Sequence, residues 1–260
     1  MYRDSSYLRP LQLLGLAGAF WSFTCMASIA AGPVKTEASA AAGPNLCPVA
    51  KADRPLPYDA ALDALSLDEL TKRANSGNAD AIMLLGLKYA PSPDHDPAAA
   101  PDTDVDKAVT LFRKAAKKGQ SHAAFLMGVA YLGGSGVEKD EKQAVDWFRR
   151  AARNGSPAGQ YWLGELMAKG RAGFNKDWEQ ALPHFKSAAE GGIPDAFIEL
   201  GYMYSSGRAL PMDYDKAAFC FRQVMAVSQI ASYNLRSLID KRFVTWQQGD
   251  PGEPVKPETP

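Results

Sequence analysis

Apolar residues in the middle of the chain recur with the spacing of an amphipathic α-helix. Ala108 is followed by Phe112 four residues later and by Ala115-Ala116 on the next turn. This spacing places the apolar side chains on one face of a helix. The pattern returns at intervals of about 36 residues, a period typical of helical repeat proteins. The later copies begin at Ala144, Ala181 and Ala217, the last without the alanine pair.

An aspartate stands four residues ahead of each of these alanines and marks the expected start of the helix. Its carboxylate can accept hydrogen bonds from the first free backbone amides. In two copies a glutamine follows three residues later, as in a capping box. Glycines predict the helix ends, because glycine adopts the left-handed conformation without steric cost. The aspartates are Asp104, Asp140, Asp177 and Asp213, the glutamines Gln143 and Gln180, and the glycines Gly119, Gly155 and Gly191-Gly192.

A second kind of segment fills the remainder of each period, at residues 81–86, 123–128, 159–164 and 196–201. Each begins with a small residue and ends with a large apolar residue followed by glycine. Small residues at a fixed position let two helices approach closely, so each period is predicted to be an αα-hairpin. One hairpin cannot bury its own apolar faces, and stacking of neighbours must complete the core. The predicted fold is therefore an all-α solenoid of four repeats.

The ends of the array carry incomplete copies of the pattern. Ser66 to Glu69 reads as a capping box that opens a lone helix, and residues 231–236 repeat the glycine-containing segment with Arg236 in place of the glycine. We therefore expect capping helices and a solenoid over residues 58–247. The flanking residues 32–57 and 248–260 are rich in proline and are predicted to be a linker and a disordered tail.

Residues 1–31 differ in composition from the rest of the chain. Arg3 and Arg9 precede an uncharged stretch over residues 11–31, with small residues at Ser28 and Ala30 that suit a cleavage site. This predicts a signal peptide and an exported, periplasmic or secreted protein. An uncut stretch of this length could instead cross a bilayer and anchor the protein in the inner membrane.

The second repeat resembles the Sel-one-like repeat family. The residues that carry the resemblance are Met127-Gly128, Tyr131, Gly134, Gly136-Val137, Asp140, Ala144, Trp147-Phe148 and Ala151-Ala152. The resemblance extends over four units, from about Asn78 to Ser228. It implies a tetratricopeptide-like, right-handed superhelix that acts as an adaptor for protein complexes. The first unit departs from the family pattern through an insertion at residues 91–103, and the third has Met167 where tyrosine is usual.

By analogy with tetratricopeptide proteins, the glycine-containing helices line a concave groove that holds a protein or peptide partner. Aromatic anchors in such a groove would give most of the binding energy. The alternative is that these side chains pack one repeat on the next. The candidate partner-binding residues are Met83, Leu87, His122, Phe125, Val129, Tyr161, Glu165, Asp195, Ile198, Tyr202 and Tyr233, with Asp80, His122 and Asp195 as the more exposed flanks.

Charge and motifs argue against several functions. Lys plus Arg (29) balances Asp plus Glu (29), so the basic surface that nucleic acid requires is missing. The sequence lacks His-Glu-x-x-His, paired Cys-x-x-Cys and Gly-x-Ser-x-Gly motifs, and we expect neither enzymatic activity nor a cofactor. His122 is expected to be solvated and His184 partly packed.

The insertion around His95 and the two cysteines outside residues 1–31 each allow more than one interpretation. The insertion brings His95 close in sequence to several aspartates, which suits a divalent cation, a partner contact or a tolerated surface loop. Cys47 and Cys220 would remain as a pair after signal removal and could form a disulfide, although Cys220 also suits a small packed side chain.

The predicted function is an exported scaffold that binds a protein or peptide partner of the cell envelope. One alternative is a hydrolase of cell-wall or β-lactam-like substrates, an activity assigned to some disulfide-rich members of the family. Those members carry a cysteine pair in each repeat, and this chain does not. Another alternative is a structural assembly module tethered to the membrane through residues 11–31.

Overall fold

The computed structural model describes residues 47–49, 59–62, 64–90, 104–245, 247 and 250, and within these ranges every regular element is a helix. A 3₁₀ turn, η3 (Ala60–Leu62), precedes ten α-helices. They are α3 (Leu67–Asn75), α4 (Ala79–Tyr89), α5 (Val105–Lys117), α6 (Ser121–Gly133), α7 (Glu141–Arg153), α8 (Pro157–Lys169), α9 (Trp178–Glu190), α10 (Pro194–Ser206), α11 (Tyr214–Val224) and α12 (Gln229–Asp240).

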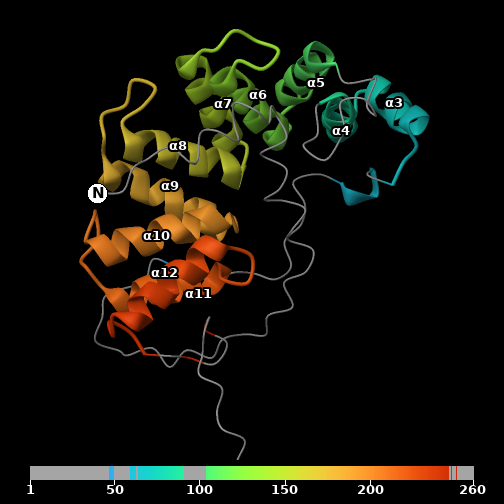
Figure 1. Cartoon of the computed structure of the whole chain (residues 1–260). Coiled ribbons are helices and arrows are strands. Elements are labelled where there is room, and N and C mark those ends of the chain that lie inside the picture. Colours follow the sequence, from blue (N-terminus) through green and yellow to red (C-terminus); the bar gives the residue numbers. More distant parts are fainter. Residues whose placement is uncertain are drawn as a thin grey trace, which may run out of the picture.

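The helices form four hairpins that stack in chain order. The hairpins are α4–α5, α6–α7, α8–α9 and α10–α11, and each helix packs mainly on the helices next to it in sequence. Figure 1 shows the stack curving as an arc from α3 and α4 at one end to α11 and α12 at the other. We call α4, α6, α8, α10 and α12 the first helices, and α5, α7, α9 and α11 the second helices. The predicted all-α solenoid of helical hairpins is confirmed.

The glycine of each first helix receives a phenylalanine ring from the second helix of the same hairpin. A Cβ added at Gly128 would lie 2.5 Å from two ring atoms of Phe148, and one at Gly201 would lie 2.5 Å from Phe221. Gly86 and Gly164 meet Phe112 and Phe185 in the same way. All four rings are fully buried. The predicted close approach of the two helices is therefore correct, and its cause is the ring lying over the glycine.

Each aspartate that opens a second helix also joins the two helices of its hairpin. Its carboxylate caps the helix as predicted, for example from Lys107 N to Asp104 Oδ1 at 2.9 Å. Its own N–H donates to the carbonyl near the end of the preceding first helix, from Asp104 to Tyr89 at 2.9 Å and from Asp140 to Tyr131 at 2.9 Å. Asp177 and Asp213 donate to Met167 and Tyr204 at 3.0 Å. We call this hydrogen bond the hairpin clamp.

The clamp explains why one detail of the capping prediction is wrong. In a capping box, the glutamine side chain would accept a hydrogen bond from the aspartate N–H. That N–H is already used by the clamp. The side chain of Gln180 instead donates from Nε2 to Asp177 Oδ2 at 2.8 Å, while the cap itself, Gln180 N to Asp177 Oδ1, is made at 2.9 Å.

Left-handed glycines end the second helices as predicted. Gly119, Gly155 and Gly192 have φ of +95°, +84° and +75°. After each of them the chain turns back at once into the next first helix, which begins within two residues. The amide that follows Gly155, Ser156 N, donates to Ala151 O at 2.9 Å, so the carbonyls left free at the end of the helix are satisfied.

Single helices cover both ends of the stack. α3 is capped by Ser66, whose hydroxyl accepts from Glu69 N at 3.3 Å, and it packs on α4. α12 packs on α11, and its Arg236 is exposed and paired with Asp240. These are the two capping helices that the sequence predicts. They close the apolar faces that the first and last hairpins would otherwise leave open.

Most of the predicted flanking segments lie outside the described residues. These include residues 1–31, the insertion at 91–103 with His95, and residues 251–260 of the tail. The right-handed superhelix stays a prediction. No helix in the described part of the chain is both long and apolar enough to cross a membrane.

Candidate functional site

The predicted partner-binding residues all lie on the first helices, but they differ in exposure. Six are buried, two are partly exposed and three are exposed. The buried ones are Met83, His122, Phe125, Val129, Glu165 and Ile198, the partly exposed ones Leu87 and Tyr161, and the exposed ones Asp195, Tyr202 and Tyr233. Their role in partner binding stays a prediction, and only the less buried members offer surface to a partner in this structure.

In the first two hairpins, these side chains belong to the core. Met83 is fully buried, and the ring of Phe125 lies 6.1 Å from Phe148 and 5.4 Å from His122, measured between centroids. The buried members of the row on α4 and α6 are therefore part of the core, and the ring contacts of Phe125 lie within its own hairpin.

His122 is buried, so the expectation of a solvated and exposed flank is wrong. Its side chain is 4% exposed, and burial lowers the pKa of the imidazole to about 4. The residue follows Gln120, whose Oε1 accepts from Ala123 N at 2.6 Å and so caps α6. Sequence reasoning placed His122 near a helix start and inferred solvation, but its ring packs near that of Phe125, with centroids 5.4 Å apart, and the side chain is buried. Burial holds the ring neutral at physiological pH.

His184 is half-buried, as predicted, and its role is local. Its Nδ1 lies 2.7 Å from Gln160 Oε1 on α8, and burial lowers the pKa of the ring. The neutral ring can then donate from Nδ1 to the glutamine carbonyl. This contact links α8 to α9 within the third hairpin.

The first helices at the C-terminal end of the stack, α10 and α12, carry exposed tyrosines. Tyr202 on α10 is 38% exposed and Tyr233 on α12 is 65% exposed. The neighbour of Tyr233, Asn234, donates from Nδ2 to the Tyr202 hydroxyl at 2.8 Å, so the two helices are joined at this surface. The Tyr202 ring packs edge-on against Phe221 at 5.9 Å, which fixes one side of it against the core.

Three acidic side chains from α8 and α10 gather around Tyr161. Glu165 is buried, forms an ion pair with Lys169 and accepts from the Tyr161 hydroxyl. Asp195 and Glu199 lie close enough for their charges to interact with that of Glu165. In the described part of the chain, neither Asp195 nor Glu199 makes a hydrogen bond or ion pair within the usual limits.

The environment disfavours charge on these groups. Burial raises the pKa of the Glu199 carboxyl to about 8, with a further rise from Glu165, while Lys169 and Arg208 offset part of it. Burial and Glu165 also raise the pKa of Asp195. Burial raises the pKa of Tyr161 well above its usual value, and the neighbouring carboxylates add to this. Glu199 is therefore mostly protonated at neutral pH and would ionise readily beside an added cation.

We call Tyr161, Glu165, Asp195, Glu199, Tyr202 and Tyr233 the tyrosine–acid surface. Sequence reasoning selected five of these residues and missed Glu199. The missed signal was its repeat position, because Leu84, Leu126 and Trp162 stand at the same place in the earlier first helices. A carboxylate in a row of large apolar residues marks a change of environment. The described residues include no group of three or more His, Cys, Asp or Glu placed to hold a metal ion.

Comparison with known families identifies the repeat. The family model "Sel1 repeat" matches residues 79–120, 121–156, 157–193 and 194–223, which together make up more than half of the chain. The chain belongs to the Sel1 repeat family. Each match begins at the start of a first helix, and together they cover the four hairpins up to one residue before the end of α11. Sel1 repeats generally mediate protein–protein binding, so the chain is a scaffold of that kind.

The chain is similar to several solved structures. A Sel1 repeat protein from Oxalobacter formigenes is 25% identical with a TM-score of 0.56, and the match covers 66% of this chain and 75% of that one. Cysteine rich protein B of Helicobacter pylori is 19% identical with a TM-score of 0.41, over 51% of this chain and 96% of that one. The protective antigen c5321 of uropathogenic Escherichia coli is 23% identical with a TM-score of 0.43. That match covers 69% of this chain and 53% of the antigen. The comparison with curated proteins found no match.

The departures from the Sel1 pattern leave the hairpins intact. Met167 replaces the usual tyrosine, yet Asp177 N still donates to its carbonyl, because the clamp uses a backbone oxygen. In the first and fourth Sel1 repeats the tyrosine ring has a further contact. The ammonium of Lys107 lies 3.6 Å from the centroid of Tyr89, and that of Lys216 lies 5.7 Å from Tyr204.

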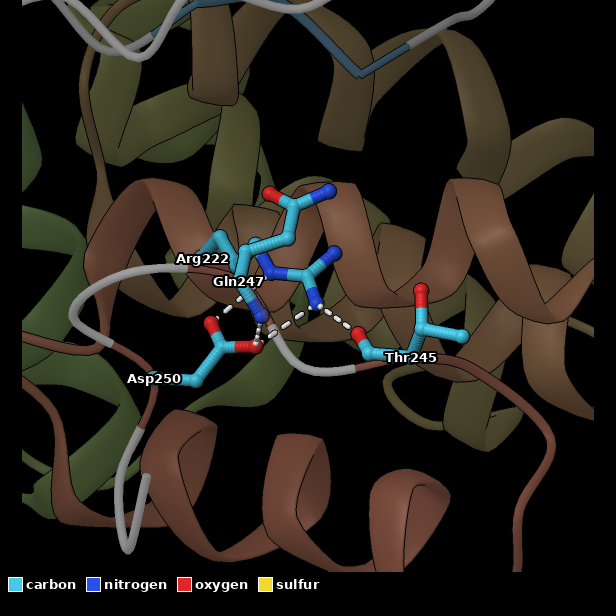
Figure 2. A network of polar contacts seen from close by, with 4 residues as sticks. All are labelled: Arg222, Thr245, Gln247 and Asp250. Carbon is cyan, nitrogen blue, oxygen red and sulfur yellow. Dashed lines mark hydrogen bonds and ion pairs between the residues drawn. The ribbon is translucent and has the colours of Figure 1, made fainter. Parts of the chain in front are cut away.

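A buried ion pair fastens the C-terminal segment to the last Sel1 repeat. Figure 2 shows Arg222 of α11 facing Asp250, with Nε to Oδ1 at 2.9 Å and Nη2 to Oδ2 at 2.8 Å. Arg222 Nη2 also donates to Thr245 O at 3.0 Å, and Asp250 Oδ2 accepts from Gln247 N at 2.8 Å. Asp250 is 4% exposed, so its assignment to a disordered tail is wrong. A proline-rich composition could not reveal this partner, because Arg222 lies on a helix far away in sequence.

Proposed function

We propose that this protein is an exported scaffold that binds a polypeptide partner of the cell envelope on the tyrosine–acid surface. The observation that carries the proposal is the exposure of Tyr202 and Tyr233 on neighbouring first helices, joined through Asn234. Tyrosine supplies a large contact area at little cost in side-chain entropy, and for this reason it is enriched among interface anchors.

The charges define the partner more closely. Asp195, Glu199 and Tyr202 follow one another at spacings of four and three residues on α10 and so share one face of that helix. Neither carboxylate has a cationic partner within ion-pair distance among the described residues. A lysine or arginine side chain of a bound segment would supply that charge and would lower the pKa of Glu199 on binding. We therefore expect the partner to present a segment that combines apolar side chains with at least one basic residue, bound across α8, α10 and α12.

Export rests on the composition of residues 1–31, which lie outside the described part of the chain. The proposal covers a cleaved signal and, as its alternative, an uncut segment that anchors the scaffold in the inner membrane. Sequencing the N-terminus of the mature protein distinguishes them. A first residue near position 31 indicates cleavage, and an intact start indicates an anchor.

Site-specific photo-crosslinking in the native host tests the binding surface. A photoreactive residue replaces Tyr233, and a control replaces Leu67 on α3, which is 51% exposed and lies at the opposite end of the stack. We expect one partner to be captured from position 233 and not from position 67. Equal capture from both positions, or capture only from position 67, would contradict the proposed surface.

A binding assay then distinguishes specific binding through the two tyrosines from nonspecific binding. The crosslinked segment of the partner is made as a peptide, and its Kd is measured for the wild type, Tyr202→Ser, Tyr233→Ser and the control Leu67→Ser. Each tyrosine variant should weaken binding about tenfold or more, as for an interface anchor worth over about 1 kcal/mol. The Leu67→Ser variant should bind as the wild type does. Circular dichroism of all variants checks that the fold is retained.

A further inference from the structure

The side chains of Cys47 and Cys220 meet although the whole helical array separates them in sequence. Both are buried in the common core, and their thiols are hydrogen-bonded to each other. Cys220 lies on α11, the second helix of the last hairpin, whereas Cys47 belongs to the segment that precedes the solenoid. Both cysteines are in the reduced state in this structure.

The contact is specific to this hairpin and to this side chain. The equivalent positions on α5, α7 and α9 hold Leu111, Trp147 and His184, so a thiol occurs at this position only on α11. In the N-terminal segment, Val49, two residues after Cys47, is 67% exposed. Residues 47–49 thus bury the Cys47 thiol in the core while the Val49 side chain stays exposed to solvent.

The same segment is also held at the opposite end of the array. Asp59 N lies 3.4 Å from Asp80 Oδ2 on α4, and Leu62 of η3 is almost fully buried. The chain between Cys47 and Asp59 therefore connects the last hairpin with the first. At full extension it can reach about 40 Å. Fixing Cys47 to α11 would join both ends of the stack through one short connection.

We propose that Cys47 and Cys220 form an intramolecular disulfide that fastens the N-terminal segment to the last hairpin and closes the arc of helices into a covalent loop. The two thiols are already neighbours in the folded state, so oxidation needs no rearrangement of α11. A loop that spans nearly the entire solenoid also removes much chain entropy from the unfolded state, which is how a disulfide stabilises most. An oxidising compartment, which the proposed export would provide, permits such a bond.

The chemistry requires an oxidant of the disulfide class, such as oxidised glutathione. The Cys47 thiol loses its proton and attacks the glutathione disulfide, which gives a mixed disulfide and releases one glutathione thiol. Cys220 then loses its proton, attacks the Cys47 sulfur and expels the second glutathione thiolate, which takes up a proton. In total, two protein thiols are oxidised by two electrons and one glutathione disulfide is reduced to two thiols.

Burial explains which cysteine reacts first. Burial raises the pKa of the Cys220 thiol well above its usual value, and the Cys47 thiol beside it raises it further. The thiolate is the nucleophile, so Cys220 on the rigid helix is a poor first attacker. In the proposed order, Cys47 therefore attacks the oxidant first. Cys220 then attacks the resulting mixed disulfide.

The test uses the full chain with Cys25→Ser, which removes the third thiol. The reduced protein is treated with oxidised glutathione, unfolded, alkylated and digested without reduction, and its peptides are weighed. We expect one linked pair that contains Cys47 and Cys220, no alkylated cysteine, and a Tm raised on the order of 10 °C that dithiothreitol reverses. Cys47→Ser in the same background leaves α11 unchanged, and it should abolish both the link and the shift.

Three results would overturn the proposal. Both cysteines could be alkylated after oxidation and unfolding, which would show that the buried pair stays reduced. Cys47 could end as a stable glutathione adduct, which would show that Cys220 cannot attack it. The cysteines could link two chains instead of one, which a non-reducing gel would reveal as a dimer. None of these outcomes depends on export or on partner binding, so the disulfide and the proposed function can fail separately.

Discussion

The ring of Phe148 fills the space in which a side chain at Gly128 would stand. A Cβ at this glycine would lie 2.5 Å from ring atoms Cδ1 and Cε1 and 3.0 Å from Cζ. The ring is fully buried and also stacks on Trp162 of the next hairpin, with centroids 5.7 Å apart. It therefore cannot move aside without disturbing two hairpins.

Gly128→Leu is expected to lower the free energy of unfolding by about 2 to 3 kcal/mol, because the added atoms overfill a packed core. Urea denaturation measures the change. Gly133→Ala on the same helix is the control, since a Cβ there meets nothing within 4 Å, and its effect should stay within about 0.5 kcal/mol. Similar stability of the two variants would mean that the helices can separate freely.

Asp140→Ala should destabilise the fold by about 1 kcal/mol through the loss of a helix cap. Its Oδ1 accepts from Lys142 N at 2.9 Å and from Gln143 N at 3.0 Å. Asp140→Asn keeps an acceptor and should be nearly neutral. The exposed Asp146→Ala, on the same helix, is a charge-matched control with little expected effect. If Asp140→Asn destabilises as much as Asp140→Ala, charge and not capping is responsible.

Glu199 is expected to make stability fall as pH rises from about 5 to 8. Its pKa of about 8 in the folded chain exceeds the ordinary 4.5, so between these values the folded chain holds a proton that the unfolded chain releases. Glu199→Gln should therefore be more stable than the wild type at pH 8.5, and the difference should shrink toward pH 5. Urea denaturation at several pH values measures it.

Two controls show whether the pH dependence belongs to Glu199. His122 acts in the opposite sense, because its pKa of about 4 lies below the ordinary 6.5 and stability is lost as pH falls between them. That contribution is common to the wild type and Glu199→Gln and cancels in their difference. Glu138→Gln, at an exposed position, should match the wild type at every pH. A difference between Glu199→Gln and the wild type that does not change with pH would contradict the prediction.

Asp250→Ala should cost about 3 kcal/mol, because it leaves the mostly buried Arg222 guanidinium without its carboxylate. The matched control is Asp240→Ala, which breaks the exposed pair with Arg236 and should cost less than about 0.5 kcal/mol. Both are measured by urea denaturation. Equal costs would show that the C-terminal segment leaves α11 easily and contributes little to stability.

Local patterns in the sequence were enough to predict the hairpins. The aspartate caps and the left-handed glycines depend on residues a few positions apart, and the repeat shows each of them several times. The close approach at the glycine of each first helix was predicted from the same repetition, although the ring that lies over it was not. The capping box at Gln180 was wrong because the aspartate N–H had a competing acceptor, Met167 O, in the preceding helix. That competition depends on how the two helices meet, which spacing alone does not determine.

Contacts between distant segments account for the other misses. The burial of Asp250 depends on Arg222, which lies 28 residues earlier on α11, and the burial of His122 depends on the packing around its ring. Neither contact recurs with the repeat, so periodicity carries no signal for them. The candidate surface was selected from repeat positions apart from Glu199. The position of Glu199 in a row of large apolar residues was a signal in the sequence, but the burial and the charges that raise its pKa are visible only in the structure.

The hairpin clamp also makes this protein a candidate frame for carrying foreign peptides. In the second repeat, the bond from Asp140 N to Tyr131 O closes a loop of residues 132–139, and in the first the same bond closes residues 90–103 at the same 2.9 Å. The frame therefore keeps its geometry over loops of different length, and doubling a loop costs only about 0.6 kcal/mol in closure entropy. A sequence grafted between clamp residues would enter and leave at fixed points, so its length could be chosen for the cargo.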